Sequence, residues 1–168
     1  DVLTGDYLAE LTMSILYNQQ QTRGEDTGYV GTFLKQVKDV AALCSEKNIK
    51  IVTNAGGLNP KSMAAEVEKI LAELGVELKV AYIDGDDLLP NLEQLQGDGE
   101  SFTNLDTQQH LKDSDQKALT ANAYLGGWGI KEGLDQGADI VICRRGTDAA
   151  VVIGPAAWKF NWQRNDYD

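Results

Sequence analysis

The sequence predicts an α/β protein with an open, mostly parallel sheet and helices on both faces, a Rossmann-like three-layer sandwich. Short apolar segments rich in β-branched residues alternate with segments in which apolar residues recur every three or four positions. Each apolar segment ends in a loop that contains glycine or acidic residues. Because crossovers between parallel strands are right-handed, this alternation favours one parallel sheet covered on both sides.

The length and composition predict a single α/β domain over residues 1–168. A formal net charge of -11 leaves no basic surface, so neither nucleic acid nor an anionic membrane is expected as a partner. Cys44 and Cys143 lie in apolar segments, which predicts buried thiols in a cytoplasmic protein. No apolar run approaches the roughly 18 residues of a membrane span.

The first part of the chain is expected to be helical. Residues 1–4 are too few for a full strand. Asp6 is expected to cap a helix that runs to about Gln21, because apolar residues recur there at helical spacing. A second amphipathic helix is expected from about Val30 to Asn48.

A strand and a well-bounded helix are expected next. Ile49–Thr53 is β-branched and apolar, as in strands buried on both faces. Asn59 is expected to cap helix Lys61–Leu74, with Pro60 at its first position. Gly75 is expected to end this helix.

The second half continues the alternation around one irregular segment. A strand is expected at Leu78–Ile83 and a short helix at Leu88–Leu95. The irregular segment is Gln96–Asp115, with a small β-ribbon expected near Phe102 and Leu111.

Two more strand and helix pairs are expected to close the fold. They are a strand at Lys117–Tyr124, a helix at Ile130–Gln136, a strand at Asp139–Cys143 and a helix at Ala149–Phe160. Thr147 or Asp148 is expected to cap the last helix.

Four loops follow the expected strands, after Thr53, Ile83, Tyr124 and Cys143. A parallel sheet brings the carboxyl ends of its strands to one edge, and ligands bind in α/β proteins at that edge. The sequence therefore predicts one composite site built from the four loops.

The loop from Asn54 to Pro60 offers backbone N–H groups near a helix N-terminus and two amide side chains. Such a loop can contact a phosphate, a carboxylate or a carbonyl group. Asn54, Gly56, Gly57 and Asn59 are the predicted binding residues. The loop matches neither the phosphate-binding nor the dinucleotide-binding glycine motif, and a tight turn with a helix cap is the alternative.

The second loop is acidic. Asp84, Asp86 and Asp87 could bind Mg²⁺ or Ca²⁺ or supply a general base, and Asp86 is the candidate for acid/base chemistry. Helix capping and a solvated turn are the alternative, which we favour. No cofactor is therefore predicted, and a divalent metal at these carboxylates stays the second choice.

The last two loops carry an amide, a phenol and two guanidinium groups. Asn122 and Tyr124 precede a glycine pair that would let a ligand approach the main chain. Arg145 is expected to bind a carboxylate or phosphate. The alternatives are a bulge and turn at the first loop, and at the second a salt bridge to Asp6, Asp84 or Asp148.

Five motifs taken together resemble one family. They are GDYLAELTM at Gly5–Met13, IVTNAGGLNP at Ile51–Pro60, GDD at Gly85–Asp87, ANAYLGGW at Ala121–Trp128 and the GADIVI and TDAA pair within Gly137–Ala150. Their order and spacing resemble the N-terminal domain of the acyclic terpene utilisation (AtuA-like) proteins. The resemblance implies a role in the breakdown of acyclic isoprenoids such as citronellol and geraniol.

The resemblance also implies that the chain is part of a larger family architecture. The family pattern has a strand and a glycine-containing loop before the first motif and a further domain after the last. Arg145, Thr147 and Asp148 fit the family pattern. Arg144 stands where the family has a glycine and is expected to crowd the site.

These observations predict an enzyme that acts on an isoprenoid-derived or branched acyl substrate, with a CoA thioester as one form. The predicted chemistry is proton transfer beside a carbonyl, as in a hydratase or lyase, with Asp6, Asp86 and Asp148 as acid/base candidates. Thr147 joins Arg145 in substrate binding.

The alternative function is a non-catalytic subunit or a protein-interaction module of a larger assembly. Exposed Trp128, Trp158 and Trp162 would then mark a partner surface, because aromatic residues are enriched in interfaces. In either case a homo-oligomer or a larger assembly is expected.

Overall fold

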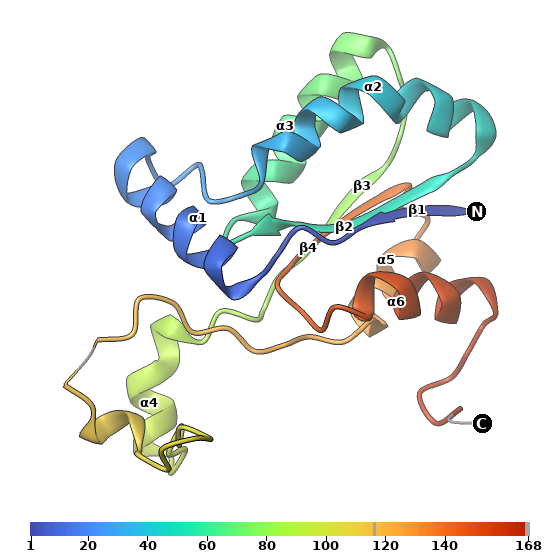
Figure 1. Ribbon diagram of the computed structural model, residues 1–168. Coiled ribbons are helices and arrows are strands. Elements are labelled where there is room, and N and C mark those ends of the chain that lie inside the picture. Colours follow the sequence, from blue (N-terminus) through green and yellow to red (C-terminus); the bar gives the residue numbers. More distant parts are fainter. Residues whose placement is uncertain (116, 167–168) are drawn as a thin grey trace.

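The computed structural model describes residues 1–115 and 117–166 (Figure 1). Within these residues, four strands form one parallel sheet in the order β1-β2-β4-β3. The strands are β1 Val2–Gly5, β2 Lys50–Gly57, β3 Val80–Ile83 and β4 Ile140–Arg144. The predicted α/β class and parallel sheet are confirmed.

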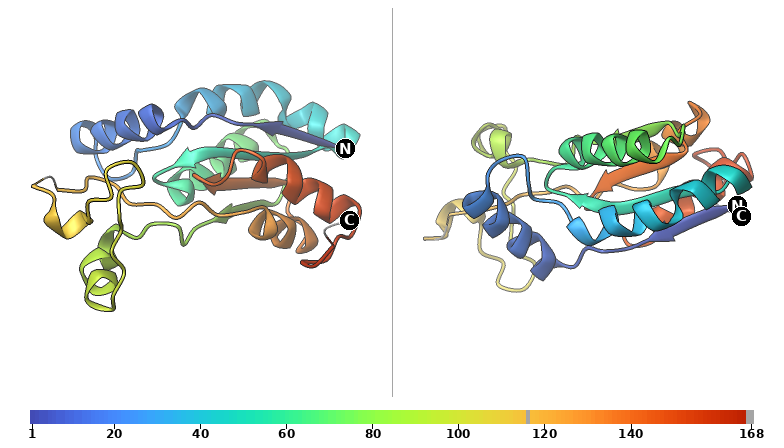
Figure 2. Two further views of the ribbon diagram at one scale, coloured as in Figure 1. Left: turned by 60° about the horizontal axis from the view of Figure 1, so that its bottom comes forward. Right: turned by 90° about the horizontal axis from the view of Figure 1, so that it is seen from above.

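The helices form the two outer layers. They are α1 Glu10–Arg23, α2 Gly31–Lys47, α3 Pro60–Leu74, α4 Leu92–Gly97, α5 Trp128–Asp135 and α6 Ala150–Lys159, with short 3-10 turns at Leu89–Asn91 and Leu111–Asp113. Helices α2 and α3 cover one face of the sheet and α5 and α6 cover the other (Figures 1 and 2). Helix α1 packs beyond the sheet edge, and α4 belongs to a segment that projects away from the sheet (Figure 2).

The central strands are buried on both faces because their side chains alternate between two cores. In β4, Ile140 and Ile142 pack with α2 and α3, whereas Val141 and Cys143 pack with α5 and α6. All four side chains are buried. This is why these strands read as continuous apolar runs in the sequence.

The path of the chain through the sheet creates a crevice at its carboxyl edge. The chain moves in one direction from β1 to β2 to β3 and then turns back to place β4 between β2 and β3. Because crossovers are right-handed, this reversal puts the later helices on the opposite face. The loop after β2 therefore leads to α3 on one face, while the loop after β4 leads to α6 on the other. Ligands bind at such divergence points.

The boundaries of α3 agree with the predicted ones. The side chain of Asn59 accepts a hydrogen bond from the Ser62 N–H at 3.0 Å, and Pro60 is the first helical residue. Gly75 ends the helix with a left-handed backbone, φ +64°. Local sequence determined this helix because each signal lies directly at the helix end that it defines: Asn59 and Pro60 at the start and Gly75 at the end.

The expectation that residues 1–4 are too few for a strand was wrong. Val2–Gly5 forms β1, and each of its residues pairs with one of Lys50–Thr53 in β2. The neighbouring strand supplies the hydrogen bonds that make so short a strand stable. The first helix begins at Glu10 rather than near Asp6, because Asp6 bonds to the Leu8 N–H and to a side chain of β2.

The predicted strand at Lys117–Tyr124 was also wrong. This segment makes only isolated bridges, one between Asp87 and Asn122, and Leu125 just beyond it pairs with Gly146. The expected β-ribbon near Phe102 and Leu111 is not formed either in the described part of the chain. Both segments lie along the projecting excursion, where no neighbouring strand offers a ladder of hydrogen bonds.

Two smaller differences affect the sheet edge. Strand β2 continues to Gly57, and its pairing with β4 shifts between Thr53 and Gly57. Such an irregularity re-aims side chains, and here it lies at Asn54. Neither Thr147 nor Asp148 caps α6 with its side chain.

Within the described residues, none of the helices combines the length and the apolar character needed to cross a lipid bilayer.

We predict that Gly56→Ala lowers the free energy of unfolding by about 1–3 kcal/mol. A Cβ at this position would lie 2.7 Å from the backbone oxygen of Cys143 and 2.7 Å from the Cβ of Pro60. Neither atom moves without disturbing β4 or the start of α3. Urea unfolding measures the change, and Gly97→Ala is the control because a Cβ there meets no atom within 4 Å. Equal stability of the two variants would contradict the tight packing at Gly56.

Candidate functional site

The shifted pairing of β2 places a buried amide at the centre of the sheet edge. The Nδ2 of Asn54 donates to Asp6 Oδ1 at 2.6 Å, and its Oδ1 accepts from the Tyr7 N–H at 2.8 Å. Asp6 Oδ1 also accepts from the Leu8 N–H at 3.2 Å. Asn54 therefore holds the segment between β1 and α1 against the sheet edge.

Arg145, which follows β4, holds the same segment from the other side. Its side chain is buried, and three of its nitrogens donate hydrogen bonds. Nε bonds to the Tyr124 hydroxyl at 2.7 Å, Nη1 to the Leu8 carbonyl at 2.6 Å and Nη2 to Glu10 Oε1 at 2.5 Å. The guanidinium also lies 4.7 Å from the centre of the Tyr124 ring. One cation thus joins three segments that are distant in the sequence.

An open groove of about 420 Å³ lies along this junction. Its lining brings together Asp6, Arg145 and Asp148, three of the residues that the sequence predicted to act together. Residues 7–10 and Thr12 complete the lining. The volume is in the range of small-molecule sites, which is about 300–1,000 Å³.

A small apolar cavity of about 20 Å³ lies at the same edge of the sheet. Asn54, Arg145 and Thr147 contribute to its lining, and most other lining residues are apolar, among them Ile83 and Val151. This space is close to that of one water molecule. Of these two spaces, the groove has the volume of a small-molecule site and the cavity does not.

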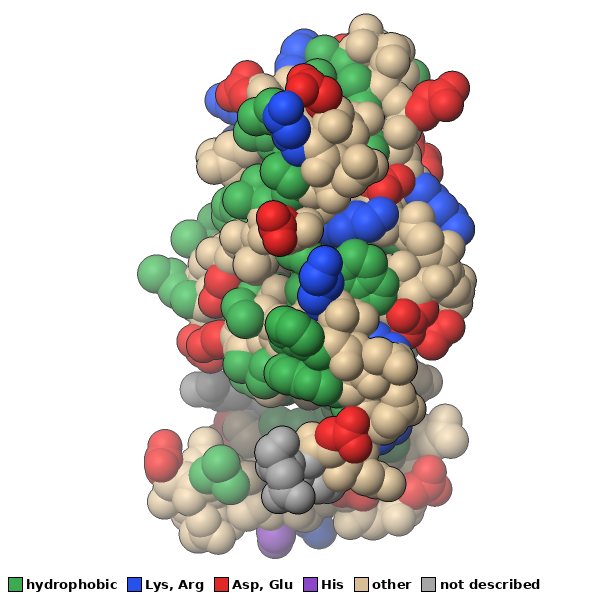
Figure 3. All heavy atoms as spheres, turned by 90° about the vertical axis from the view of Figure 1, so that its right-hand side faces the viewer, with side chains coloured by type: hydrophobic (Ala, Val, Ile, Leu, Met, Phe, Trp, Pro, Cys, Tyr) green, Lys and Arg blue, Asp and Glu red, His purple; other side chains and the backbone are tan. Residues whose placement is uncertain are grey.

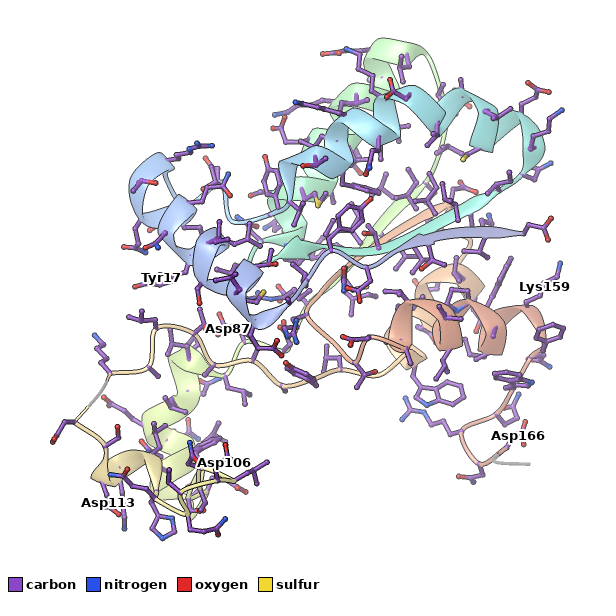
Figure 4. All side chains as sticks on the ribbon, in the orientation of Figure 1. Tyr17, Asp87, Asp106, Asp113, Lys159 and Asp166 are labelled. Atoms are coloured by element: carbon purple, nitrogen blue, oxygen red, sulfur yellow. The ribbon has the colours of Figure 1, made fainter. Side chains whose placement is uncertain are left out.

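Arg144 contacts the acidic loop after β3. Its guanidinium nitrogens lie 3.0 Å from Asp84, 2.6 Å from Asp86 and 3.5 Å from Asp87. The contact of Nε with Asp86 is an ion pair without hydrogen-bond alignment. Figure 4 shows Asp87 where the chain leaves the sheet for the excursion. Arg144 also lines the small cavity, and the predicted crowding of the site by Arg144 stays a prediction.

Asp86 is the fully buried member of this cluster. Its Oδ2 accepts a hydrogen bond from Asn122 Nδ2 at 2.9 Å, which explains why the segment around Asn122 lies beside the acidic loop. Burial raises the pKa of Asp86, while Arg144 and Asn122 act in the opposite direction. Asp86 thus serves as the counter-ion of Arg144 rather than as part of the groove lining.

The other predicted binding residues lie in contact with the protein itself. A Cβ at Gly57, where φ is +55°, would meet Leu16 and the Gly28 carbonyl. The Asn59 side chain caps α3 and donates to the Glu25 carbonyl at 2.8 Å. Residues 25–29 lie beside Gly57 and Asn59, and Cys143 and Pro60 lie beside Gly56. The role of these three residues as a ligand cradle stays a prediction.

The cysteines are buried, as predicted. Burial raises the pKa of Cys143 to about 12, and its Sγ donates to the Thr53 carbonyl at 3.1 Å. A nucleophile needs the thiolate form, so Cys143 has a structural role at neutral pH.

In the described ranges, no group of three or more His, Cys, Asp and Glu side chains has the arrangement of a metal site. The divalent metal at Asp84, Asp86 and Asp87 stays a prediction. The charge of Arg144 already neutralises part of that cluster.

Sequence reasoning missed Glu10 as a site residue. Its carboxylate bonds to Arg145 and accepts from the Tyr124 hydroxyl at 2.9 Å. The signal in the sequence that could have pointed to Glu10 is its position in the first motif, three residues after Tyr7.

We predict that the stability of Asp86→Asn relative to the unsubstituted chain rises with pH. The pKa of Asp86 is higher in the folded chain than its ordinary value of 3.8. Between pH 3.8 and this higher pKa, the folded chain therefore binds more protons than the unfolded chain. The stabilising contribution of Asp86 is then fully present below pH 3.8 and is lost as pH rises through the folded pKa. Asparagine does not titrate.

Urea unfolding between about pH 4 and pH 8 measures this difference. Asp98→Asn, which removes an exposed carboxylate, controls for the change in net charge. A stability difference for Asp86→Asn that falls with pH would contradict the burial argument.

Comparison with known proteins identifies the family. The family described as acyclic terpene utilisation family protein AtuA matches residues 1–168, which is the whole chain. A search of curated proteins and a search of solved structures each found no match. The family match agrees with the resemblance carried by the five motifs, two of which supply Asp6, Arg145 and Asp148 of the groove. The chain therefore belongs to the AtuA family of acyclic terpene utilisation proteins.

Proposed function

We propose that this protein is an enzyme that acts on an isoprenoid-derived or branched acyl substrate by proton transfer beside a carbonyl group. The observation that carries the proposal is the groove, which gathers Asp6, Arg145 and Asp148 from the segments that follow β1 and β4. Membership of a terpene utilisation family supports the choice of substrate class.

The roles follow from the environments of the groove residues. Asp6 and Asp148 are exposed carboxylates on the groove lining, so each can exchange a proton with a bound substrate. Asn54 fixes Asp6 through the 2.6 Å hydrogen bond, which limits the movement of that carboxylate. Arg145 is the cation of the groove and holds an anionic part of the substrate.

The small cavity suggests where a hydrocarbon chain would lie. Its lining includes Ile83, Leu125 and Val151, and Arg145 lines both this cavity and the groove. A branched chain enters only if the segment around Leu125 moves away. That segment lies outside the strands and is held to the next loop by the Thr147 N–H, 3.0 Å from the Leu125 carbonyl.

We predict that the chain catalyses exchange of the hydrogens next to the carbonyl of 3-methylbutanoyl-CoA in D₂O. Asp6→Asn and Asp148→Asn are each expected to slow deuterium incorporation by about 100-fold or more, because general acid/base groups contribute that much. Mass spectrometry of the recovered thioester measures the incorporation. Asp98→Asn is the control carboxylate. No exchange above the uncatalysed rate would sink the proposed chemistry.

A second candidate is an interaction module, and one observation favours it. Phe160 is 68% exposed and Trp162 42% exposed, and their rings stack with centroids 5.9 Å apart. Figure 3 shows hydrophobic side chains on the surface of the side of the molecule where α6 ends. Trp128 and Trp158 are partly buried, so Trp162 is the most exposed of the three tryptophans that were predicted to mark a partner surface.

If this aromatic pair binds a second copy of the chain, a Phe160→Ser and Trp162→Ser double variant should sediment with a lower mass than the unsubstituted chain. Aromatic residues contribute much of the binding energy in interfaces. Leu105→Ser, an exposed apolar residue in the excursion, is the control. Equal masses across the series would count against self-association through this patch.

A further inference from the structure

Arg145 is a buried cation whose carboxylate partner is almost free in solvent. The side chain of Arg145 is 7% exposed and that of Glu10 is 80% exposed. Glu10 loses little burial on moving into water, because its carboxylate is already largely hydrated, and an anion that takes its place keeps the buried charge of Arg145 paired. Moving Arg145 into water would break its bonds to Leu8 and Tyr124. The pair is therefore asymmetric: the anion can leave and the cation stays.

The position of the Glu10 carboxylate is a preformed site for one oxygen of an anion. Arg145 Nη2 and the Tyr124 hydroxyl both donate to Glu10 Oε1, at 2.5 and 2.9 Å. The pKa of Glu10 is lowered by its own backbone N–H, by Tyr124 and by Arg145. Ala9 at the N-cap of α1 supplies no side-chain acceptor, so the helix N-terminus adds to the positive potential there.

We propose that this position is a binding site for the free carboxylate of a branched acid, and that Glu10 occupies it as a built-in competitor until the ligand displaces it. The inference rests on the proposed function and concerns the form of the branched substrate that carries a free carboxylate, which it assigns to Arg145. It adds the chemical class of that group and a residue that sets the affinity.

The charges of the groove favour a carboxylate over a phosphate. Among the described residues that line it, Asp6, Glu10 and Asp148 are acidic and Arg145 is the basic one. A doubly charged phosphate would meet stronger repulsion from Asp6 and Asp148 than a singly charged carboxylate. The occupant that the site already accommodates is itself a carboxylate.

Binding of 3-methylbutanoate to the full chain tests the proposal, with uncharged 3-methylbutanamide as the matched ligand. Titration calorimetry or NMR gives the dissociation constants. Glu10→Gln is expected to bind 3-methylbutanoate about tenfold more tightly than the unsubstituted chain, because a neutral competitor loses the charge-assisted hydrogen bonds. The affinity for the amide should not change.

Two further variants complete the design. Glu93→Gln is the charge-matched control, since Glu93 is an exposed glutamate in the first turn of α4. Tyr124→Phe removes one hydrogen-bond donor from the site. Because Tyr124 is half exposed, this variant is expected to fold. It should weaken binding of 3-methylbutanoate several-fold. Arg145→Gln should abolish the preference for the acid over the amide.

The outcomes separate the two proposals. If 3-methylbutanoate binds through Arg145 and Tyr124 but Glu10→Gln leaves its affinity unchanged, Glu10 does not compete with the ligand. The proposal that Glu10 is a built-in competitor is then overturned. If the unsubstituted chain and Glu10→Gln both bind the acid no better than the amide, the anion-binding role of Arg145 in the proposed function falls as well. Tighter binding of inorganic phosphate than of 3-methylbutanoate would overturn the choice of a carboxylate.

Discussion

Two adjacent buried arginines at the end of β4 require anionic or carbonyl partners, and the segments that supply these partners form the carboxyl edge of the sheet. Arg144 and Arg145 are 8% and 6% exposed. A buried guanidinium without partners is costly, so each arginine fixes the segments around it. Arg144 draws in the acidic loop after β3, and Arg145 draws in the segment between β1 and α1. Successive side chains along a strand point to opposite faces of the sheet, so Arg144 and Arg145 contact different parts of the edge.

The ion-pair clusters around Arg144 and Arg145 differ in how far their acidic partners are exposed to solvent. The central partner of Arg144 is Asp86, which is fully buried and also bonded by Asn122, so this pair cannot open without exposing the core. The acidic partner of Arg145 is Glu10, which faces solvent beside an open groove. A closed cluster stabilises the fold, whereas an open one leaves a cation that a ligand can reach. This contrast is why the candidate site lies at Arg145 and Asp148 rather than at the acidic loop.

Membership of the AtuA family and the geometry of the groove are consistent with each other. The motif that ends β1 supplies Asp6 and Glu10, the motif of β2 supplies Asn54, and the motif after β4 supplies Arg145 and Asp148. Segments that looked separate in the sequence meet at one edge because all four strands are parallel. The segment between β3 and α5 contributes to this edge from its two ends, where Asp86 contacts Arg144 and Tyr124 contacts Arg145. Figure 4 shows Asp87 at the start of the excursion.

The sequence by itself determined the class of fold, the central strands and the ends of α3, because alternation, apolar runs and the Asn59, Pro60 and Gly75 signals are local. It also indicated that the loops after Thr53, Ile83 and Cys143 would share an edge. Only the tertiary structure decided that Val2–Gly5 is a strand, since its hydrogen bonds come from β2. The same holds for the coil at Lys117–Tyr124 and for the pairing of Glu10 with Arg145. These features depend on partners far away in the chain, and no local pattern encodes the energy that such a partner contributes.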